Sequence, residues 1–233
     1  MPLNVNGNIL TSNGTKYFNY KNIVTTNLIC YIDAANSNSY PGTGTTWYDL
    51  FNRNRACSLN SGPTHTSGVG GYFTFDGVDD SVTLGTLSGY GTSVTCEAVF
   101  KTTSGNTWKN IICGPTNDII FTVNGGLLNF GCQGSSPIPH ANYSTTTVNT
   151  GAWFHGVATY DGSNVRIYIN GVKESTTART GTITPGTLYV GSNSGGSSEF
   201  YVGQLGFAKM YNTVLTDAQV LQNFNALRGR YGI

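Results

Sequence analysis

The segment from Trp153 to Lys173 constrains the fold of this chain more than any other stretch. Residues 155–160 have the composition of a strand, and alternate residues are apolar over 165–169, as in a strand with one buried side. Each stretch is followed by a turn signal, Asp161-Gly162 and then Asn170-Gly171, whose residues tolerate the backbone angles of tight hairpin turns. The segment therefore predicts neighbouring antiparallel strands joined by hairpins.

The same succession of short strands and turns continues through the chain from residue 27 onward. Alternation is clear over 93–101, where every second residue is apolar or small. Further strands are expected at 28–32, 71–75, 81–84, 187–191 and 201–211. Because these strands follow one another without intervening helices, the sequence predicts an all-β sandwich or barrel, in one domain over residues 25–233.

The two ends of the chain differ from this pattern. Near the C-terminus, Thr216 and Gln219 have the spacing of a capping box, and an apolar stripe follows them, which predicts a helix over 216–228 that packs against the sandwich. Residues 1–24 are rich in Asn and hold only short apolar patches. We expect them to form an N-terminal arm, which is either a disordered leader or a segment that orders against a neighbouring subunit.

Composition excludes several classes of function. Only 10 % of the residues are charged, against about a quarter in ordinary domains. The formal net charge is +1 and the basic residues are scattered, so we expect no nucleic-acid binding. No apolar run reaches the length of a membrane span, and the first ten residues do not resemble a signal peptide, so we expect no membrane contact and folding in a reducing cytoplasm. The five cysteines are irregularly spaced, which predicts buried free thiols rather than disulfides.

Three stretches together resemble one known family. Residues 73–80 (FTFDGVDD), 153–171 (WFHGVATYDGSNVRIYING) and 203–219 (GQLGFAKMYNTVLTDAQ) are similar to motifs of laminin G-like jelly-roll domains in the concanavalin A-like lectin and glucanase superfamily. The resemblance covers residues 27 to about 225. It implies a sandwich of twelve to fourteen strands, with one flat and one curved sheet.

Two further stretches resemble virion proteins of tailed phages. Residues 31–50 are similar to the opening of those domains and residues 223–233 to their ending, whereas residues 51–57 lack the glycines that usually follow the opening. The resemblance implies a non-enzymatic structural protein on the particle surface, as a capsid decoration, head fibre or tail-fibre component. It would be assembled in the host cytoplasm with other virion proteins as partners, as a homo-oligomer, most simply a trimer. The alternatives are a freestanding carbohydrate-binding adhesin module and, third, a glycan-degrading enzyme.

The carboxylates bear on the enzymatic alternative. Glycoside hydrolases need two carboxyl groups that face each other across the scissile bond. The chain has three glutamates, Glu97, Glu174 and Glu199, and none has an acidic residue two or four positions later. Glu97 is the one candidate in the middle of a strand, and we expect its carboxylate to lie on a solvated sheet face. The sequence therefore favours a protein without catalytic activity.

Three aspartates form the candidate metal site. Asp76, Asp79 and Asp80 crowd one turn, and many members of the resembled family hold a calcium ion between loop carboxylates. Turn-forming hydrogen bonds from aspartate explain the same residues without a metal. Asp33 and Asp49, in the opening stretch, are alternative or additional ligands.

Aromatic and amide side chains in two expected loops form the candidate glycan site. Sugar recognition combines aromatic rings that stack on the sugar with amides or carboxylates that bind its hydroxyl groups. Trp108 and Asn110 lie in the first loop and Tyr143 in the second. These three residues are the predicted contacts for a surface glycan.

Overall fold

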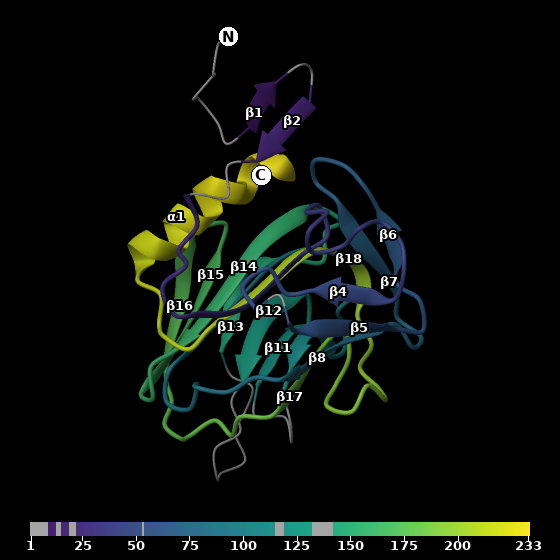
Figure 1. The fold of residues 1–233 in the computed structure, drawn as a ribbon. Coiled ribbons are helices and arrows are strands. Elements are labelled where there is room, and N and C mark those ends of the chain that lie inside the picture. Colours follow the sequence, from purple (N-terminus) through teal and green to yellow (C-terminus); the bar gives the residue numbers. More distant parts are fainter. Residues whose placement is uncertain (1–8, 13–14, 19–21, 53, 115–118, 132–141) are drawn as a thin grey trace.

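The computed structural model of the chain describes residues 9–12, 15–18, 22–52, 54–114, 119–131 and 142–233 (Figure 1). Two antiparallel eight-stranded sheets form a sandwich. Sheet I has the order β13 (Tyr143–Thr147), β12 (Leu127–Gly131), β11 (Ile120–Asn124), β10 (Lys109–Cys113), β17 (Thr187–Val190), β8 (Ser81–Thr86), β5 (Ala56–Asn60) and β4 (Thr46–Tyr48). Sheet II has the order β16 (Val172–Ala178), β15 (Asn164–Ile169), β14 (Trp153–Tyr160), β9 (Val94–Lys101), β18 (Val202–Tyr211), β7 (Tyr72–Asp76) and β6 (Thr64–Thr66), and β3 (Leu28–Asp33) pairs with β18.

The predicted all-β sandwich is confirmed, and the hairpin segment forms as expected. Strand β14 pairs with β15 in the register Val157 to Tyr168, and β15 pairs with β16. The turns contain Gly162 at φ +86°, Asn170 at φ +50° and Gly171 at φ +80°, which is the left-handed conformation that tight hairpins require. The two eight-stranded sheets hold more strands than the twelve to fourteen that the resemblance implied.

The main core lies between the two sheets. Its largest side chains are aromatic and fully buried; among them are Trp47, Phe73, Phe75, Phe100, Phe121 and Phe130. The four described cysteines, Cys30, Cys57, Cys96 and Cys113, are buried free thiols, as predicted, while Cys132 lies outside the described residues. Among the described residues, no helix has the length and apolar character to cross a membrane.

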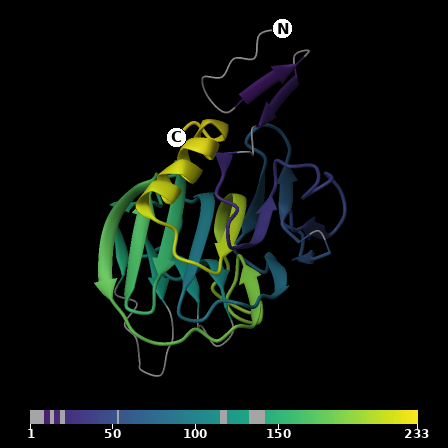
Figure 2. The same ribbon diagram turned by 60° about the vertical axis from the view of Figure 1, so that its left-hand side comes forward.

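A second core lies on the outer face of sheet II, beneath helix α1 (Asp217–Leu227) and the short 3₁₀ helix η3 (Arg228–Arg230). The capping box is confirmed, since the Gln219 amide donates to Thr216 Oγ1 at 3.3 Å and the Thr216 amide to Gln219 Oε1 at 2.9 Å. Val220 and Leu227 of the helix pack on this face, which also contains Val99. The helix lies along the side of the sandwich in both ribbon views (Figures 1 and 2).

Glu97 lies on this covered face, so the expectation of a solvated carboxylate is wrong. The side chain is fully buried. It contacts Lys209 Nζ at 2.8 Å, His155 Nε2 at 3.0 Å and Asn223 Nδ2 at 2.7 Å. Burial in the core would raise the pKa of Glu97, but the Lys209 ammonium and the His155 hydrogen bond outweigh it and hold this pKa at about 2.

The N-terminal arm contains a hairpin of strands β1 (Ile9–Ser12) and β2 (Thr15–Phe18), which pairs with neither sheet of the sandwich. In both ribbon views it stands beyond the end of α1, apart from the sandwich (Figures 1 and 2). Residues 22–24 are bonded to the domain, because Gln222 Nε2 donates to the Asn22 carbonyl at 2.9 Å, and Val24 donates to Asn223 Oδ1 at 2.8 Å and accepts from Tyr211 Oη at 3.1 Å.

Candidate functional site

A row of polar residues crosses the outer face of sheet I. Asn110 on β10 pairs with Thr122 on β11, Thr122 with Asn129 on β12, and Asn129 with Tyr143 on β13. Directly opposed residues of neighbouring antiparallel strands share a face of the sheet. With neighbouring strands about 4.8 Å apart, the row spans about 14 Å. We call these four residues, together with the adjoining Asn142, the amide row.

The amide row is buried although its four paired residues face away from the core. Asn110, Thr122 and Asn129 are fully buried, Asn142 is nearly so, and Tyr143 is half-buried. The loop before β18 covers one end, where Asn110 Nδ2 donates to Glu199 Oε2 at 2.7 Å. At the other end, Asn129 Nδ2 donates to the Asn142 carbonyl at 3.1 Å. At each end of the amide row, a polar group from a neighbouring segment, Glu199 or Asn142, therefore forms a hydrogen bond with a side chain of the row.

Three buried amide atoms in this row have no hydrogen-bond partner within the described part of the chain. They are Asn110 Oδ1 and both Oδ1 and Nδ2 of Asn142. A buried polar atom without a hydrogen-bond partner lowers the stability of the fold by about 1–3 kcal/mol, so such atoms are rare in native proteins. Their presence here indicates a site where a ligand supplies the partner. A hydroxyl group both donates and accepts, and is therefore complementary to these atoms.

Glu199 has a strained backbone. Its φ angle is +54°, in the left-handed region that side chains other than glycine rarely adopt. Its carbonyl accepts the Asn110 amide at 3.2 Å, while its carboxylate accepts from the Asn110 side chain. Strain of this kind persists only where the surroundings fix it, and it is common at functional sites. The carboxylate is half-exposed and adds a strong acceptor at the rim of the amide row.

The three predicted glycan contacts fall on or beside this row. Asn110 and Tyr143 are members of it, although Asn110 lies in strand β10 and is buried, not in an exposed loop. Trp108 directly precedes β10 and is half-buried. Asn142 adjoins Tyr143 in the second predicted glycan segment, whereas sequence reasoning missed Asn129 and Glu199 as contacts; the polar Asn129 between the apolar Leu128 and Phe130 was the one available signal.

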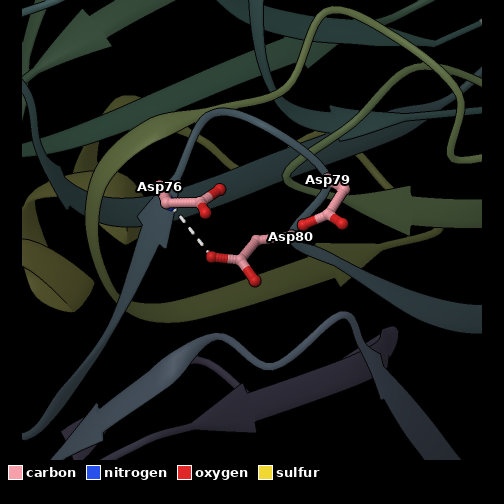
Figure 3. A group of neighbouring side chains, drawn as sticks. All are labelled: Asp76, Asp79 and Asp80. Carbon is pink, nitrogen blue, oxygen red and sulfur yellow. Dashed lines mark hydrogen bonds between the residues drawn. The ribbon is translucent and has the colours of Figure 1, made fainter.

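The predicted metal residues also come together (Figure 3). Asp76 ends β7 of sheet II and Asp80 precedes β8 of sheet I, so the turn crosses from one sheet to the other. One carboxylate oxygen from each of Asp76, Asp79 and Asp80 lies within 4.8 Å of the others. Calcium holds its ligands at about 2.3–2.6 Å, so two oxygens on one ion lie at most about 5 Å apart. The geometry therefore fits a calcium ion.

The same turn is also held by its own hydrogen bonds. Asp80 Oδ2 accepts the Asp76 amide at 2.9 Å, and Asp76 Oδ1 accepts the Val78 amide at 2.8 Å. Burial raises the pKa of the Asp80 carboxyl, and the negative charges of Asp76 and Asp79 raise it further, although the Asp76 amide opposes this. A bound cation would offset that repulsion. The turn is thus stable by itself and is able to hold a metal.

The two alternative metal ligands are engaged elsewhere. Asp33 is fully buried and forms an ion pair with Arg230, and Asp49 is fully buried and pairs with Arg55 at 2.8 Å. Each carboxylate is neutralised by a guanidinium group, and neither lies in the turn that brings Asp76, Asp79 and Asp80 together.

Known structures share this fold at low sequence identity. The sialidase of Trypanosoma rangeli in complex with sialic acid has a TM-score of 0.67 and 12 % identity, over 98 % of this chain and 37 % of that chain. Domain 4 of AbnA, a GH43 extracellular arabinanase from Geobacillus stearothermophilus, was solved in complex with arabinotriose. It has a TM-score of 0.65 and 16 % identity, over 85 % of this chain and 98 % of that chain. The binding domain of Paraclostridial Mosquitocidal Protein 1 has a TM-score of 0.64 and 13 % identity, over 86 % of this chain and 52 % of that chain.

These similarities define the fold, which enzymes share. The chain spans about a third of the length of the sialidase chains that it matches. No curated protein matches the sequence. The family profile described as the concanavalin A-like lectin/glucanases superfamily matches residues 76–221, which is more than half of the chain. This match confirms the resemblance carried by the three central motifs, and the chain belongs to the concanavalin A-like lectin/glucanase superfamily.

Proposed function

We propose that this chain is a non-catalytic carbohydrate-binding sandwich and that its sugar site is the amide row. The observation that carries the proposal is the set of buried amide atoms without partners on Asn110 and Asn142. Neutral sugars offer hydroxyl groups that complement amides, and a chain with net charge +1 has little long-range attraction for charged ligands. The similar arabinanase domain was solved with arabinotriose, which supports the same ligand class.

The test is binding of neutral oligosaccharides, first on a glycan array and then by titration calorimetry with the best ligand. Asn110→Ala and Glu199→Gln each remove one polar contact and are expected to weaken binding roughly tenfold. Asn60→Ala is the matched control, because Asn60 lies on the same face of sheet I but distant in strand order from the amide row. An array without any bound glycan, or equal weakening by all three variants, would reject this site.

The absence of catalysis is part of the proposal. It is supported by the position of Glu97, the one mid-strand glutamate candidate, which is fully buried and bonded to Lys209, His155 and Asn223. Glu97 lies on sheet II beneath α1 and is engaged by these three groups, so it does not face the proposed sugar site on sheet I. The assay is release of new reducing ends from the bound glycan, and any release above that of the heat-denatured chain would contradict the proposal.

We also propose display on a phage particle, for which the N-terminal hairpin is the supporting observation. The hairpin pairs with neither sheet and stands apart from the sandwich (Figure 2). An isolated two-stranded hairpin is only marginally stable, so residues 9–18 suit an anchor that orders against another virion protein or another copy of the chain. Deletion of residues 1–18 is expected to abolish incorporation into particles while leaving sugar binding intact. Equal incorporation would count against a virion anchor.

A further inference from the structure

Three reactive side chains meet on the outer face of sheet II, beneath α1. They are Lys209 on β18, Glu97 on β9 and Asn223 on α1, and none of them is exposed to solvent. Glycan binding at the amide row on sheet I does not use them. A fully buried lysine is uncommon, since removing an ammonium group from water is costly.

One carboxylate holds both nitrogen atoms. Lys209 Nζ lies 2.8 Å from Glu97 Oε1, and Asn223 Nδ2 lies 2.7 Å from Glu97 Oε2. The two oxygens belong to the same carboxylate, so a primary amine and a carboxamide are both held against it. For the two groups to react, the lysine side chain moves past this carboxylate until Nζ reaches the carboxamide carbon of Asn223.

We propose that Lys209 and Asn223 become joined by an isopeptide bond between Nζ and Cγ, formed by the chain itself with Glu97 as the proton carrier. Glu97 takes a proton from the Lys209 ammonium through the existing hydrogen bond. The lone electron pair of the resulting neutral amine then attacks Asn223 Cγ and gives a tetrahedral intermediate. Glu97 delivers its proton to Nδ2, the Cγ–Nδ2 bond breaks with release of ammonia, and the second amine proton passes to the Glu97 carboxylate and from there to the released ammonia. The sum is amine plus carboxamide giving a secondary amide plus ammonia, without any oxidant or cofactor.

The surroundings assist each part of this reaction. Val24 donates its amide to Asn223 Oδ1 at 2.8 Å, where negative charge develops when the amine attacks. Tyr211 Oη lies 2.9 Å from the departing Nδ2. The Phe207 ring lies 4.6 Å from Lys209 Nζ and helps to exclude water. Burial lowers the pKa of Lys209, although Glu97 opposes this, and a lower pKa favours the free amine that attacks.

His155 completes the cluster. Its Nε2 lies 3.0 Å from Glu97 Oε1, the oxygen that also contacts Lys209. Its other ring nitrogen, Nδ1, has no hydrogen-bond partner among the described residues and is buried. Because a carboxylate only accepts hydrogen bonds, Nε2 carries the hydrogen, and the imidazole holds the Glu97 carboxylate in place beside Lys209. The expected product is a covalent tie between the last strand of sheet II and the helix that covers it.

The test is mass spectrometry of the purified, folded full-length chain. The isopeptide bond makes the denatured chain lighter than its sequence by one ammonia. Trypsin does not cleave after an acylated lysine, so residues 180–228 are expected to remain one peptide, with Lys209 linked to Asn223 in its fragment spectrum. A chain that keeps the unmodified mass after prolonged incubation, and is cleaved after Lys209, would overturn the proposal.

Two variants distinguish formation of the isopeptide bond from other reactions that release ammonia. Lys209→Arg keeps a positive charge beside Glu97 but removes the nucleophile, so the full mass is expected to return. Lys173→Arg is the control, because Lys173 contacts α1 through Asp217 at the surface, and the loss is expected to persist there. If the loss persists in Lys209→Arg, it comes from an asparagine that has cyclised with its own backbone, and the proposal is wrong. Should Lys209→Arg fail to fold, the fragment spectrum of the original chain decides alone.

Discussion

Asp33 and Arg230 form a two-pronged ion pair that is buried in the sandwich. Each carboxylate oxygen of Asp33 accepts from a different nitrogen of the Arg230 guanidinium, and neither side chain is exposed. Tyr31 Oη also donates to Asp33, at 2.7 Å. The pair joins the beginning of the domain to its last residues. It therefore holds residues 31–50, at the beginning of the domain, against residues 223–233.

Loss of one member of this pair is expected to destabilise the fold strongly. Arg230→Ala leaves the Asp33 carboxylate buried without its counter-charge, and such a change costs about 3–5 kcal/mol in the free energy of unfolding. Urea denaturation followed by tryptophan fluorescence measures it. Arg228→Ala is the control, because Arg228 is exposed and only stacks on the Phe224 ring, so a change below about 1 kcal/mol is expected. Equal midpoints for both variants would show that the buried pair adds no stability.

The sequence alone predicted the features that depend on neighbours along the chain. The turn at Asn170 and Gly171 and the cap at Thr216 follow from local backbone geometry, and both formed as expected. The three aspartates of one turn had to lie close together for the same reason. Such features need no knowledge of how distant strands pack.

The features that failed depend on distant contacts. Glu97 alternates with apolar residues, as on a solvent-facing strand, but its partners Lys209 and Asn223 lie 112 and 126 residues away. That face of sheet II is buried because α1 covers it. The amide row was missed in the same way, because Asn110 and Asn129 become neighbours in one row only through the register of β10, β11 and β12.

Glu174 is expected to hold two sheet edges together. It lies on β16, the edge of sheet II, and Oε2 accepts the amides of Thr145 at 2.8 Å and Thr146 at 3.0 Å on β13, the edge of sheet I. Hydrogen bonds to a charged group contribute about 1.5–3 kcal/mol, and the edge position reduces this, so we expect Glu174→Ala to cost about 2 kcal/mol. Native-state hydrogen exchange is expected to quicken at Thr145 and Thr146. Lys173→Ala, next to it but directed to Asp217, should leave both rates unchanged.

The buried thiols are expected to be unreactive in the folded chain. Burial raises the pKa of Cys57 to about 12 and that of Cys113 to about 12, so almost no thiolate exists at pH 8. Brief treatment of the folded chain with iodoacetamide, followed by peptide mapping, should label neither residue. Both should be labelled in guanidinium chloride. Labelling of Cys57 at the same rate in both conditions would show that this part of the core opens readily.

Calcium binding at the aspartate turn is expected to depend on pH. The pKa of Asp80 is raised above 3.8 in the folded chain, mainly by burial. Without metal, the folded chain binds a proton at Asp80 more tightly than the unfolded chain does, so this contribution to stability is present at low pH and is lost as the pH rises through the folded pKa. A calcium ion needs the ionised form. The gain in Tm on adding calcium should therefore be larger at pH 7 than at pH 4.

The size of the calcium-induced rise in Tm follows from mass action. Calcium at roughly 100 times its Kd stabilises the folded chain by about 2.7 kcal/mol, which corresponds to a Tm rise of about 5–10 °C for a chain of this size. Asp79→Asn removes one of the three carboxylates and should abolish most of the rise at pH 7. Asp217→Asn, an exposed carboxylate on α1, should keep it. If calcium and chelator give the same Tm at pH 7, the hydrogen bonds of Asp76 and Asp80 alone account for the turn.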